Sequence, residues 1–97
     1  MGSNTIFYKI FYHHLIIKED VPELNNDILK RIKTAIETRL LTAPEKHGLP
    51  LRKTLKGYWK LRVGDYRIVY WIVKGEIHVL AMCHRSKVYK IALSRIH

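Results

Sequence analysis

The second half of the chain alternates between apolar and polar residues, and this period of two is interrupted only at two short turns. Runs rich in β-branched and aromatic residues flank Gly64-Asp65 and Lys74-Gly75. Two residues that include glycine are the usual length of a tight β-hairpin turn, which leaves no room for a helix between the strands. We therefore predict three consecutive antiparallel strands, at residues 58–63, 66–73 and 76–83.

An amphipathic helix is predicted in the first half of the chain, over about residues 28–41. Asn25, Asn26 and Asp27 supply the side-chain oxygens that favour a helix N-terminus. Apolar residues then recur every three or four positions on one face, namely Ile28, Ile32, Ala35, Ile36 and Leu40. Because a chain of 97 residues needs such a stripe for its own core, we expect this face to pack on the sheet.

The remaining elements are shorter. Residues 6–12 predict a strand, residues 15–17 predict a short helix that is interrupted before Pro22, and residues 42–50 predict a loop. Val88, Ala92 and Ile96 recur every four residues and predict a short terminal helix. The expected fold is α+β, one domain over residues 1–97 in the order β-α-α-β-β-β-α, with a small antiparallel sheet and helices packed on one face.

Positive charge is concentrated in the second half of the sequence. The chain has 18 Lys and Arg against 8 Asp and Glu, a net charge of +10. Residues 1–50 hold seven basic and six acidic residues, whereas residues 51–97 hold eleven basic residues and only Asp65 and Glu76 as acids. Such asymmetry favours a surface that binds a polyanion, most commonly nucleic acid; a basic protein that is merely soluble is the alternative.

Composition argues against several other classes of protein. No apolar run approaches the ~20 residues that cross a bilayer, and no signal-peptide pattern is found. The lone Cys83, expected in the core, excludes a disulfide framework and suits a cytoplasmic protein. The carboxylates are scattered and His13-His14 is an adjacent pair whose side chains diverge, so we expect neither a metal site nor a cofactor.

The turn at Gly64-Asp65 sets the register of the hairpin. It places Arg62 opposite Arg67 and Lys60 opposite Val69. Because side chains alternate between the two sides of a sheet, Lys60, Arg62 and Arg67 are predicted on one side. The other side then receives the apolar set of Trp59, Leu61, Val63, Tyr66, Ile68 and Tyr70.

This cationic set is costly for stability, because like charges directly opposite one another on a ladder repel. The arginines could simply be solvated and point apart, but a cradle for phosphate is the interpretation we favour, since guanidinium groups bind phosphate oxygens bidentately. His84 and Arg85 follow the last strand, and Tyr89 follows Arg85 by one helical turn. We expect them to converge with the hairpin cations on one concave surface.

Such a cluster suits phosphate chemistry without a metal. RNA carries its own nucleophile, the 2′-hydroxyl, so cleavage needs a base, an acid and cations around the phosphorane. Lys60 or Tyr89 could serve as the base if neighbouring cations depress its pKa, and His84 is a candidate acid. The residue pattern does not choose between these roles.

Three segments resemble the RelE/ParE superfamily of toxins from bacterial and archaeal toxin–antitoxin pairs. They are residues 55–62 (LKGYWKLR), 64–70 (GDYRIVY) and 84–89 (HRSKVY). The strand at residues 8–13 and the long helix also fit the family layout. Tyr58 stands where the best-known members carry a second lysine, and a gap-free alignment places Cys83 at their late arginine.

The resemblance implies a RelE-like fold and, for the RelE branch, metal-independent cleavage of messenger RNA in the ribosomal A site, which inhibits translation. It implies catalytic roles for Lys60, Arg62, Arg67, Arg85 and Tyr89, and the matching segments add Lys56, His84 and Lys87 as candidate substrate-binding residues. It also implies an acidic, partly disordered antitoxin that covers the basic surface.

Two alternatives to an endoribonuclease follow from the same resemblance. The ParE branch inhibits DNA gyrase and generally lacks the terminal arginine–tyrosine pair, so Arg85 and Tyr89 favour the RelE branch. A non-catalytic RNA-binding or antitoxin-binding member is the second alternative.

Overall fold

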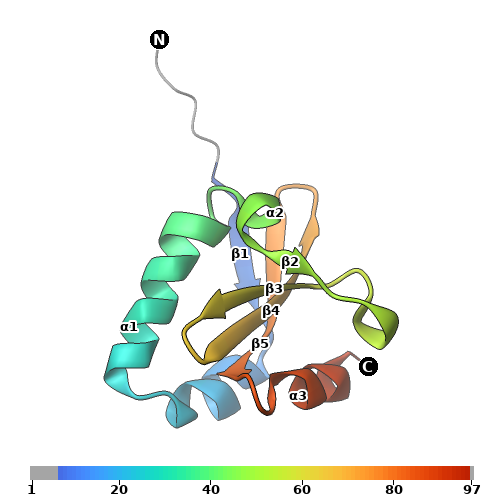
Figure 1. Ribbon diagram of the computed structural model, residues 1–97. Coiled ribbons are helices and arrows are strands. Elements are labelled where there is room, and N and C mark those ends of the chain that lie inside the picture. The colour runs from blue at the N-terminus through green and yellow to red at the C-terminus, as the bar shows by residue number, and fades with distance from the viewer. Residues whose placement is uncertain (1–6, 97) are drawn as a thin grey trace.

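A computed structural model describes residues 7–96, and its centre is a five-stranded sheet (Figure 1). The spatial order of the strands is β1-β5-β4-β3-β2. Their bounds are β1 Lys9–Tyr12, β2 Leu49–Pro50, β3 Trp59–Val63, β4 Tyr66–Val73 and β5 Glu76–His84.

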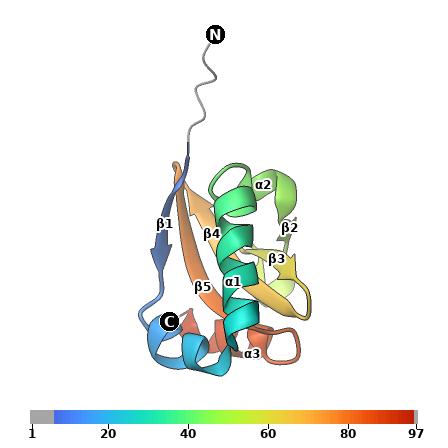
Figure 2. The same cartoon turned by 90° about the vertical axis from the view of Figure 1, so that its left-hand side faces the viewer.

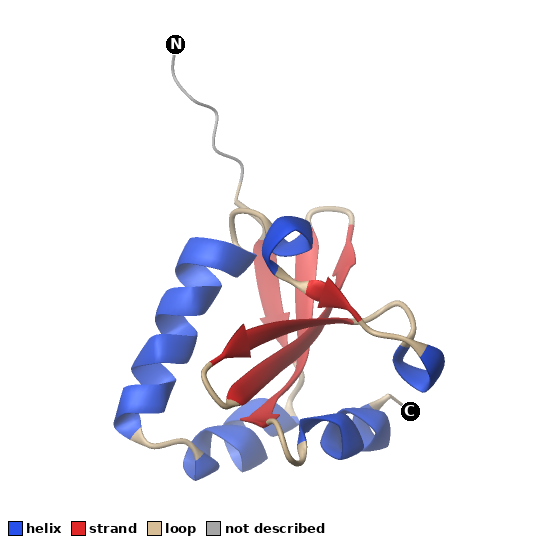
Figure 3. Ribbon diagram, viewed as in Figure 1, coloured by secondary structure: helices blue, strands red, loops and turns tan. Residues whose placement is uncertain are grey.

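Helical segments surround the sheet (Figure 3). The α-helices are α1 Asn26–Ala35, α2 Pro44–His47 and α3 Val88–Arg95. Shorter or wider helical turns are η1 Ile16–Asp20, η2 Val21–Glu23, η3 Ile36–Leu40 and η4 Lys53–Leu55. Within residues 7–96, none of these helices is long and apolar enough to cross a membrane.

The predicted hairpins and their register are confirmed. Gly64 has a φ of +60°, and a glycine with positive φ at the first central position is typical of a type II′ turn. Arg62 pairs with Arg67, and Lys60 pairs with Val69, as the turn length requires. At the second turn both Lys74 and Gly75 have positive φ, the pattern of a type I′ turn.

The amphipathic helix also forms over the residues whose apolar spacing predicted it. Asn25 caps α1, because its side-chain oxygen accepts a hydrogen bond from the backbone N–H of Ile28 at 2.9 Å. The helix continues from α1 into the wider turn η3, so that helical structure extends to Leu40. Its buried face packs on one side of the sheet, in a core with Leu61, Ile68 and other strand residues.

The α+β class is confirmed, but the helices cover both sides of the sheet rather than one. In Figure 2, α1 crosses in front of the sheet, while α3 lies behind it at the lower end. Val88 and Ala92 of α3 pack with Val69 and Cys83 in a second core. The physical reason lies in β5, whose residues are apolar on both sides between positions 79 and 83 and therefore need cover on both.

The sheet is also mixed rather than purely antiparallel, because β1 pairs with β5 in parallel. Strand β1 is far from β5 in the sequence, so no turn between them dictates the direction of pairing.

Pro22, expected to interrupt the short helix, instead lies within η2, which follows η1 directly. In the expected loop at residues 42–50, Pro44 starts α2. The hydroxyl of the buried Tyr70 donates to the carbonyl of Pro44 at 2.8 Å and so ties α2 to the sheet.

A buried ion pair completes the edge of β5 beyond the end of β1. The carboxylate of Asp20 accepts two hydrogen bonds from the guanidinium of Arg95, at 2.7 and 2.8 Å, and both side chains are 2% exposed. Asp20 also accepts from the backbone N–H of Met82, and Arg95 donates to the carbonyl of Leu80. Two side chains thus satisfy the backbone groups that a neighbouring strand would otherwise pair, and the same bonds anchor the last turn of α3.

Replacing Asp20 with alanine is expected to destabilise the protein by about 3–5 kcal/mol, because Arg95 is left buried without its counter-ion. The matched control is Glu23→Ala, which removes the exposed pair between Glu23 and Lys87 and should cost at most about 1 kcal/mol. Urea unfolding measures both. Equal losses in the two variants would contradict the structural role of the buried pair.

Candidate nucleic-acid-binding and catalytic site

Three basic side chains of the β3–β4 hairpin share the side of the sheet on which α3 packs. Lys60 pairs with Val69, and Val69 belongs to the core beneath α3. Arg62 and Arg67 pair with each other two residues further along, and therefore lie on the same side. We call Lys60, Arg62 and Arg67 the cationic face. Their predicted placement on one side of the sheet is confirmed.

Arg67 is held in place by the turn that it follows. One nitrogen of its guanidinium, Nη1, donates to the carbonyls of Gly64 and Tyr66, both at 2.9 Å. Since these bonds use only one of the three guanidinium nitrogens, the others retain donors for an anion. Within residues 7–96, no salt bridge involves any of the three cations of the face. The positive charge of the cationic face is therefore not neutralised by carboxylates of the described chain.

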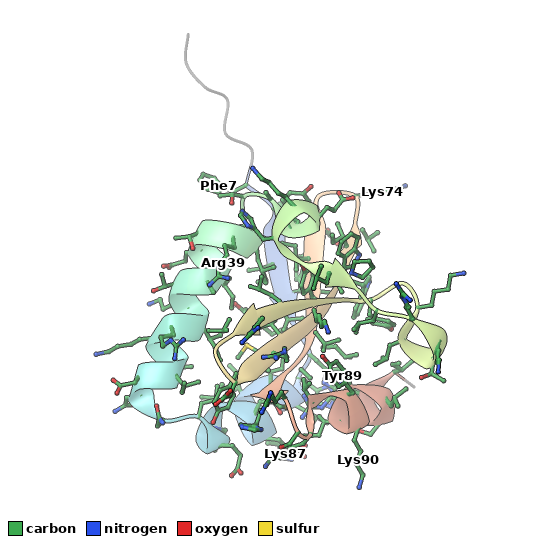
Figure 4. All side chains as sticks on the ribbon, viewed as in Figure 1. Phe7, Arg39, Lys74, Lys87, Tyr89 and Lys90 are labelled. Atoms are coloured by element: carbon green, nitrogen blue, oxygen red, sulfur yellow. The ribbon has the colours of Figure 1, made fainter. Side chains whose placement is uncertain are left out.

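Tyr89 approaches the cationic face from α3. The Lys60 Nζ lies 5.9 Å from the centre of the Tyr89 ring, within cation–π range. Figure 4 shows Tyr89 projecting from α3 toward the strands, whereas Lys90 points away from them. The two side chains proposed as alternative bases thus lie next to each other, although they come from β3 and α3.

Arg85 is brought to the same end of the sheet by its backbone. Its N–H donates to the carbonyl of Asp65 at 2.8 Å, which joins the segment after β5 to the β3–β4 turn. The Arg85 side chain is exposed. This bond places Arg85 next to the turn whose Gly64 carbonyl orients Arg67.

Two of the candidate substrate-binding residues lie elsewhere. His84 pairs with Tyr66, which belongs to the α1 side of the sheet, and its ring meets the Tyr66 ring edge to face at 5.3 Å. Lys87 forms an ion pair with Glu23 at 3.7 Å. The expectation that His84 joins the cations is therefore wrong, because the alternation along β5 turns it to the opposite side. Lys56 is exposed and directly follows the buried Leu55, which packs in the core on the α3 side.

Cys83 is a buried core residue, as predicted. It pairs with Arg67 across the β4–β5 ladder and packs beneath α3. Burial, reinforced by the charge of Asp20, raises the pKa of the Cys83 thiol to about 12. The thiol therefore remains protonated near neutral pH and adds no charge to the site.

The sequence reasoning missed an aromatic row beside the cationic face. Tyr58, Trp71, His78 and Phe11 contact one another in this order across four neighbouring segments. Two of its four residues could have been found from the alternation along the predicted strands. Tyr58 lies two residues from Lys60, and Trp71 lies four from Arg67, so each shares a side of the sheet with those cations. Phe11 and His78 could not be added, because the partner of β1 was unknown from the sequence.

A second basic surface lies between α1 and β3. It is a groove of about 600 Å³ whose basic lining comprises Lys30, Arg31, Arg39 and Arg62. Arg39 donates from Nη1 to the carbonyl of Arg62 at 3.4 Å. Arg62 thus borders both basic surfaces.

Among residues 7–96, no cluster of three His, Cys, Asp or Glu side chains has the arrangement of a metal site.

Residues 6–89 match the family described as ParE toxin of the type II toxin–antitoxin system parDE. The chain belongs to this family. The chain is also 39% identical over 54 residues to toxin RelE of Mycobacterium tuberculosis (strain ATCC 25618 / H37Rv). That alignment covers 54% of this chain and 56% of the relative, so the chain spans about half the length of this RelE.

Solved structures of a RelBE2 complex and of toxin RelE contain chains with the same fold. The toxin–antitoxin complex RelBE2 of Mycobacterium tuberculosis contains a chain with a TM-score of 0.75 and 27% identity, over 82% of this chain and 100% of that one. A mutant of Escherichia coli toxin RelE in the free state gives a TM-score of 0.69 at 24% identity, over 94% and 99% of the two chains. The RelE-like fold expected from the sequence is therefore confirmed.

The raised pKa of Cys83 predicts an unreactive thiol in the folded protein. At pH 8 a pKa of about 12 in place of 9.0 leaves far less thiolate, so alkylation by iodoacetamide should be at least about a hundredfold slower than for a free cysteine. Mass spectrometry of timed samples measures the rate. Unfolding in guanidinium is the control and should restore ordinary reactivity. Fast labelling of the folded chain would show that the Cys83 thiol is not buried.

Proposed function

We propose that the protein is the toxin of a toxin–antitoxin pair and that it cleaves messenger RNA on the ribosome without a metal ion. The observation that carries the proposal is the convergence of Lys60, Arg62 and Arg67 with Tyr89. Three cations that form no ion pair with a carboxylate of residues 7–96 fit a phosphodiester, whose charge increases in the transition state. An ionisable phenol beside them adds a group that can transfer a proton.

The proposed reaction is a transesterification within the RNA. A base removes the proton of the 2′-hydroxyl, and the oxygen attacks the adjacent phosphorus. The bond to the 5′-oxygen breaks, and an acid protonates that leaving oxygen, which leaves a 2′,3′-cyclic phosphate and a 5′-hydroxyl. Arg67, already oriented by Gly64 and Tyr66, is suited to stabilise the phosphorane.

Lys60 and Tyr89 are the two candidate bases. Each is only partly exposed, and the Lys60 Nζ lies 5.9 Å from the centre of the Tyr89 ring, so we propose that both face the same bound phosphate. His84 is excluded from the acid role in our proposal, because it belongs to the α1 side of the sheet. Arg85 remains a candidate for binding the substrate phosphate at the turn end of the site.

The site by itself offers little recognition of RNA sequence. Guanidinium and ammonium groups bind phosphates of any sequence, so base identity is not read at this surface. We propose that the ribosome positions the messenger RNA and thereby supplies the orientation that the small domain lacks.

An acidic antitoxin is the proposed partner. The structurally similar RelBE2 chain was solved in a toxin–antitoxin complex. Here, an apolar groove of about 490 Å³ between α1 and β1 includes Tyr12, Ile17 and Leu29. An amphipathic antitoxin segment fits this groove, and its acidic residues would neutralise the basic second half of the chain.

Inhibition of DNA gyrase is the second candidate function. The observation in its favour is that the matching family is described by ParE toxins. It would need no RNA chemistry at Lys60 or Tyr89, which makes the two candidates separable by experiment.

Induced expression in growing bacteria, combined with mapping of transcript 5′ ends, is expected to show new ends within translated codons. Free RNA should be cut poorly, and a chelator should leave the activity on ribosomes unchanged. Induction of the DNA-damage response with intact transcripts would instead support gyrase inhibition. Unaffected growth would indicate a member that only binds its antitoxin.

Arg67→Ala and Tyr89→Phe are expected to abolish growth arrest while the domain stays folded, because each removes a group that faces the phosphate. Lys90→Ala is the matched control on α3, since Lys90 points away from the strands (Figure 4). Colony counts after induction measure arrest, and circular dichroism measures folding. Full arrest by both folded variants would mean that the chemistry lies elsewhere.

A further inference from the structure

The aromatic row, formed by Phe11, His78, Trp71 and Tyr58, extends across the sheet at right angles to its strands. Phe11 pairs with His78, and His78 pairs with Trp71, so the three residues are cross-strand neighbours on β1, β5 and β4. Their rings are stacked, with centroid separations of 5.2 and 4.7 Å and interplanar angles of 18° and 12°. Tyr58 closes the Trp71 end edge to face at 5.5 Å. The result is a short column of parallel rings.

One end of this column is open. Strand β1 is the outermost strand of the sheet, and Phe11 is 45% exposed. Among residues 7–96, no ring stacks on Phe11 other than that of His78. A further flat ring placed on the outer face of Phe11 would continue the column, whereas Tyr58 prevents continuation at the other end.

The column is oriented before any ligand arrives. The Nε2 of His78 lies 3.0 Å from Oε1 of Glu76, a contact that fixes the plane of the imidazole ring between its two neighbours. Trp71 and Tyr58 also pack against the core on the α3 side. Because the rings are already held, a ligand that stacks on them loses little entropy through ordering the protein.

The row lies on the same side of the sheet as the cationic face. Along β4, Trp71 and Arg67 are separated by four residues, about 13 Å at the usual rise of a strand. Glu76, an acid on this side, is engaged with His78. Positive charge beside an aromatic column is the combination by which proteins bind single-stranded nucleic acid: cations follow the phosphates and rings stack on the bases.

We propose that the aromatic row is a stacking site for an unpaired base of RNA, which binds on the outer face of Phe11 while the backbone of the same strand reaches the cationic face. This inference rests on the proposed function, because it takes RNA as the ligand of that face. It adds a base-binding subsite on the same side of the sheet, at the edge formed by β1. Stacking tolerates any base, so the subsite adds affinity without sequence preference.

The test measures binding of a 2′-O-methyl oligoribonucleotide, which lacks the attacking hydroxyl and therefore stays intact on the wild-type protein. Fluorescence polarisation compares the wild type with Phe11→Leu and Trp71→Leu, which keep apolar volume but remove the flat ring. Phe7→Leu is the matched control, because it makes the same substitution at a phenylalanine outside the row. Phe7 is 59% exposed, and its ring stacks on no other ring among the described residues.

We expect Phe11→Leu and Trp71→Leu to weaken binding by about tenfold, the typical effect of losing one stacking partner. Phe7→Leu should bind like the wild type. A second oligonucleotide of equal length and charge, with abasic positions in place of bases, should bind all four proteins equally weakly. Thermal melting of each variant separates loss of stacking from loss of folding.

The outcomes distinguish this inference from the proposed function. If the wild type binds RNA and all variants bind equally well, the aromatic row only stabilises the sheet and the inference is overturned. The same conclusion follows if the abasic oligonucleotide binds as tightly as the complete one. If the wild type binds neither oligonucleotide and cuts no messenger RNA on ribosomes, the proposed function itself fails.

Discussion

The buried pair between Asp20 and Arg95 is the constraint on which the placement of α3 depends. Strand β1 covers only the first part of the outer edge of β5, and this pair satisfies Met82 and Leu80 beyond it. Arg95 is the last residue of α3, so the bonds that complete the sheet also hold the helix. Since Tyr89 reaches Lys60 from that helix, the geometry of the candidate site depends on an interaction formed on the far side of β5. The hydrogen bonds that Arg95 donates to the Asp20 carboxylate raise the pKa of Arg95, so the guanidinium stays charged at any ordinary pH.

The cationic face lowers the local stability of the β3–β4 hairpin in the unbound protein. Arg62 and Arg67 lie directly opposite each other on the ladder, which costs on the order of a few tenths of a kcal/mol compared with a neutral pair. No described carboxylate relieves this repulsion through an ion pair. A bound phosphate would relieve it, which is why the site is suited to a polyanion rather than to a neutral ligand.

The candidate site could be predicted from the sequence wherever neighbours along the chain determine it. Lys60, Arg62 and Arg67 were placed correctly, because a two-residue turn leaves one register. His84 was not, because its position depends on how the chain leaves β5. The ion pair of Lys87 with Glu23, a residue distant in sequence, could not be foreseen either. The aromatic row was missed for a related reason. Half of it comes from β1 and β5, whose pairing is made across more than sixty residues of intervening chain.

The sequence by itself determined the hairpins, the capped helix α1 and the side of the sheet that carries the cations, because each follows from the spacing of residues along a few turns or strands. Only the tertiary structure decided that β1 runs parallel to β5 and that α3 covers the side opposite α1. Both depend on which backbone groups and apolar surfaces remain uncovered after the local elements have formed. Asp20 and Arg95 meet for that reason, at an edge that exists only in the folded sheet.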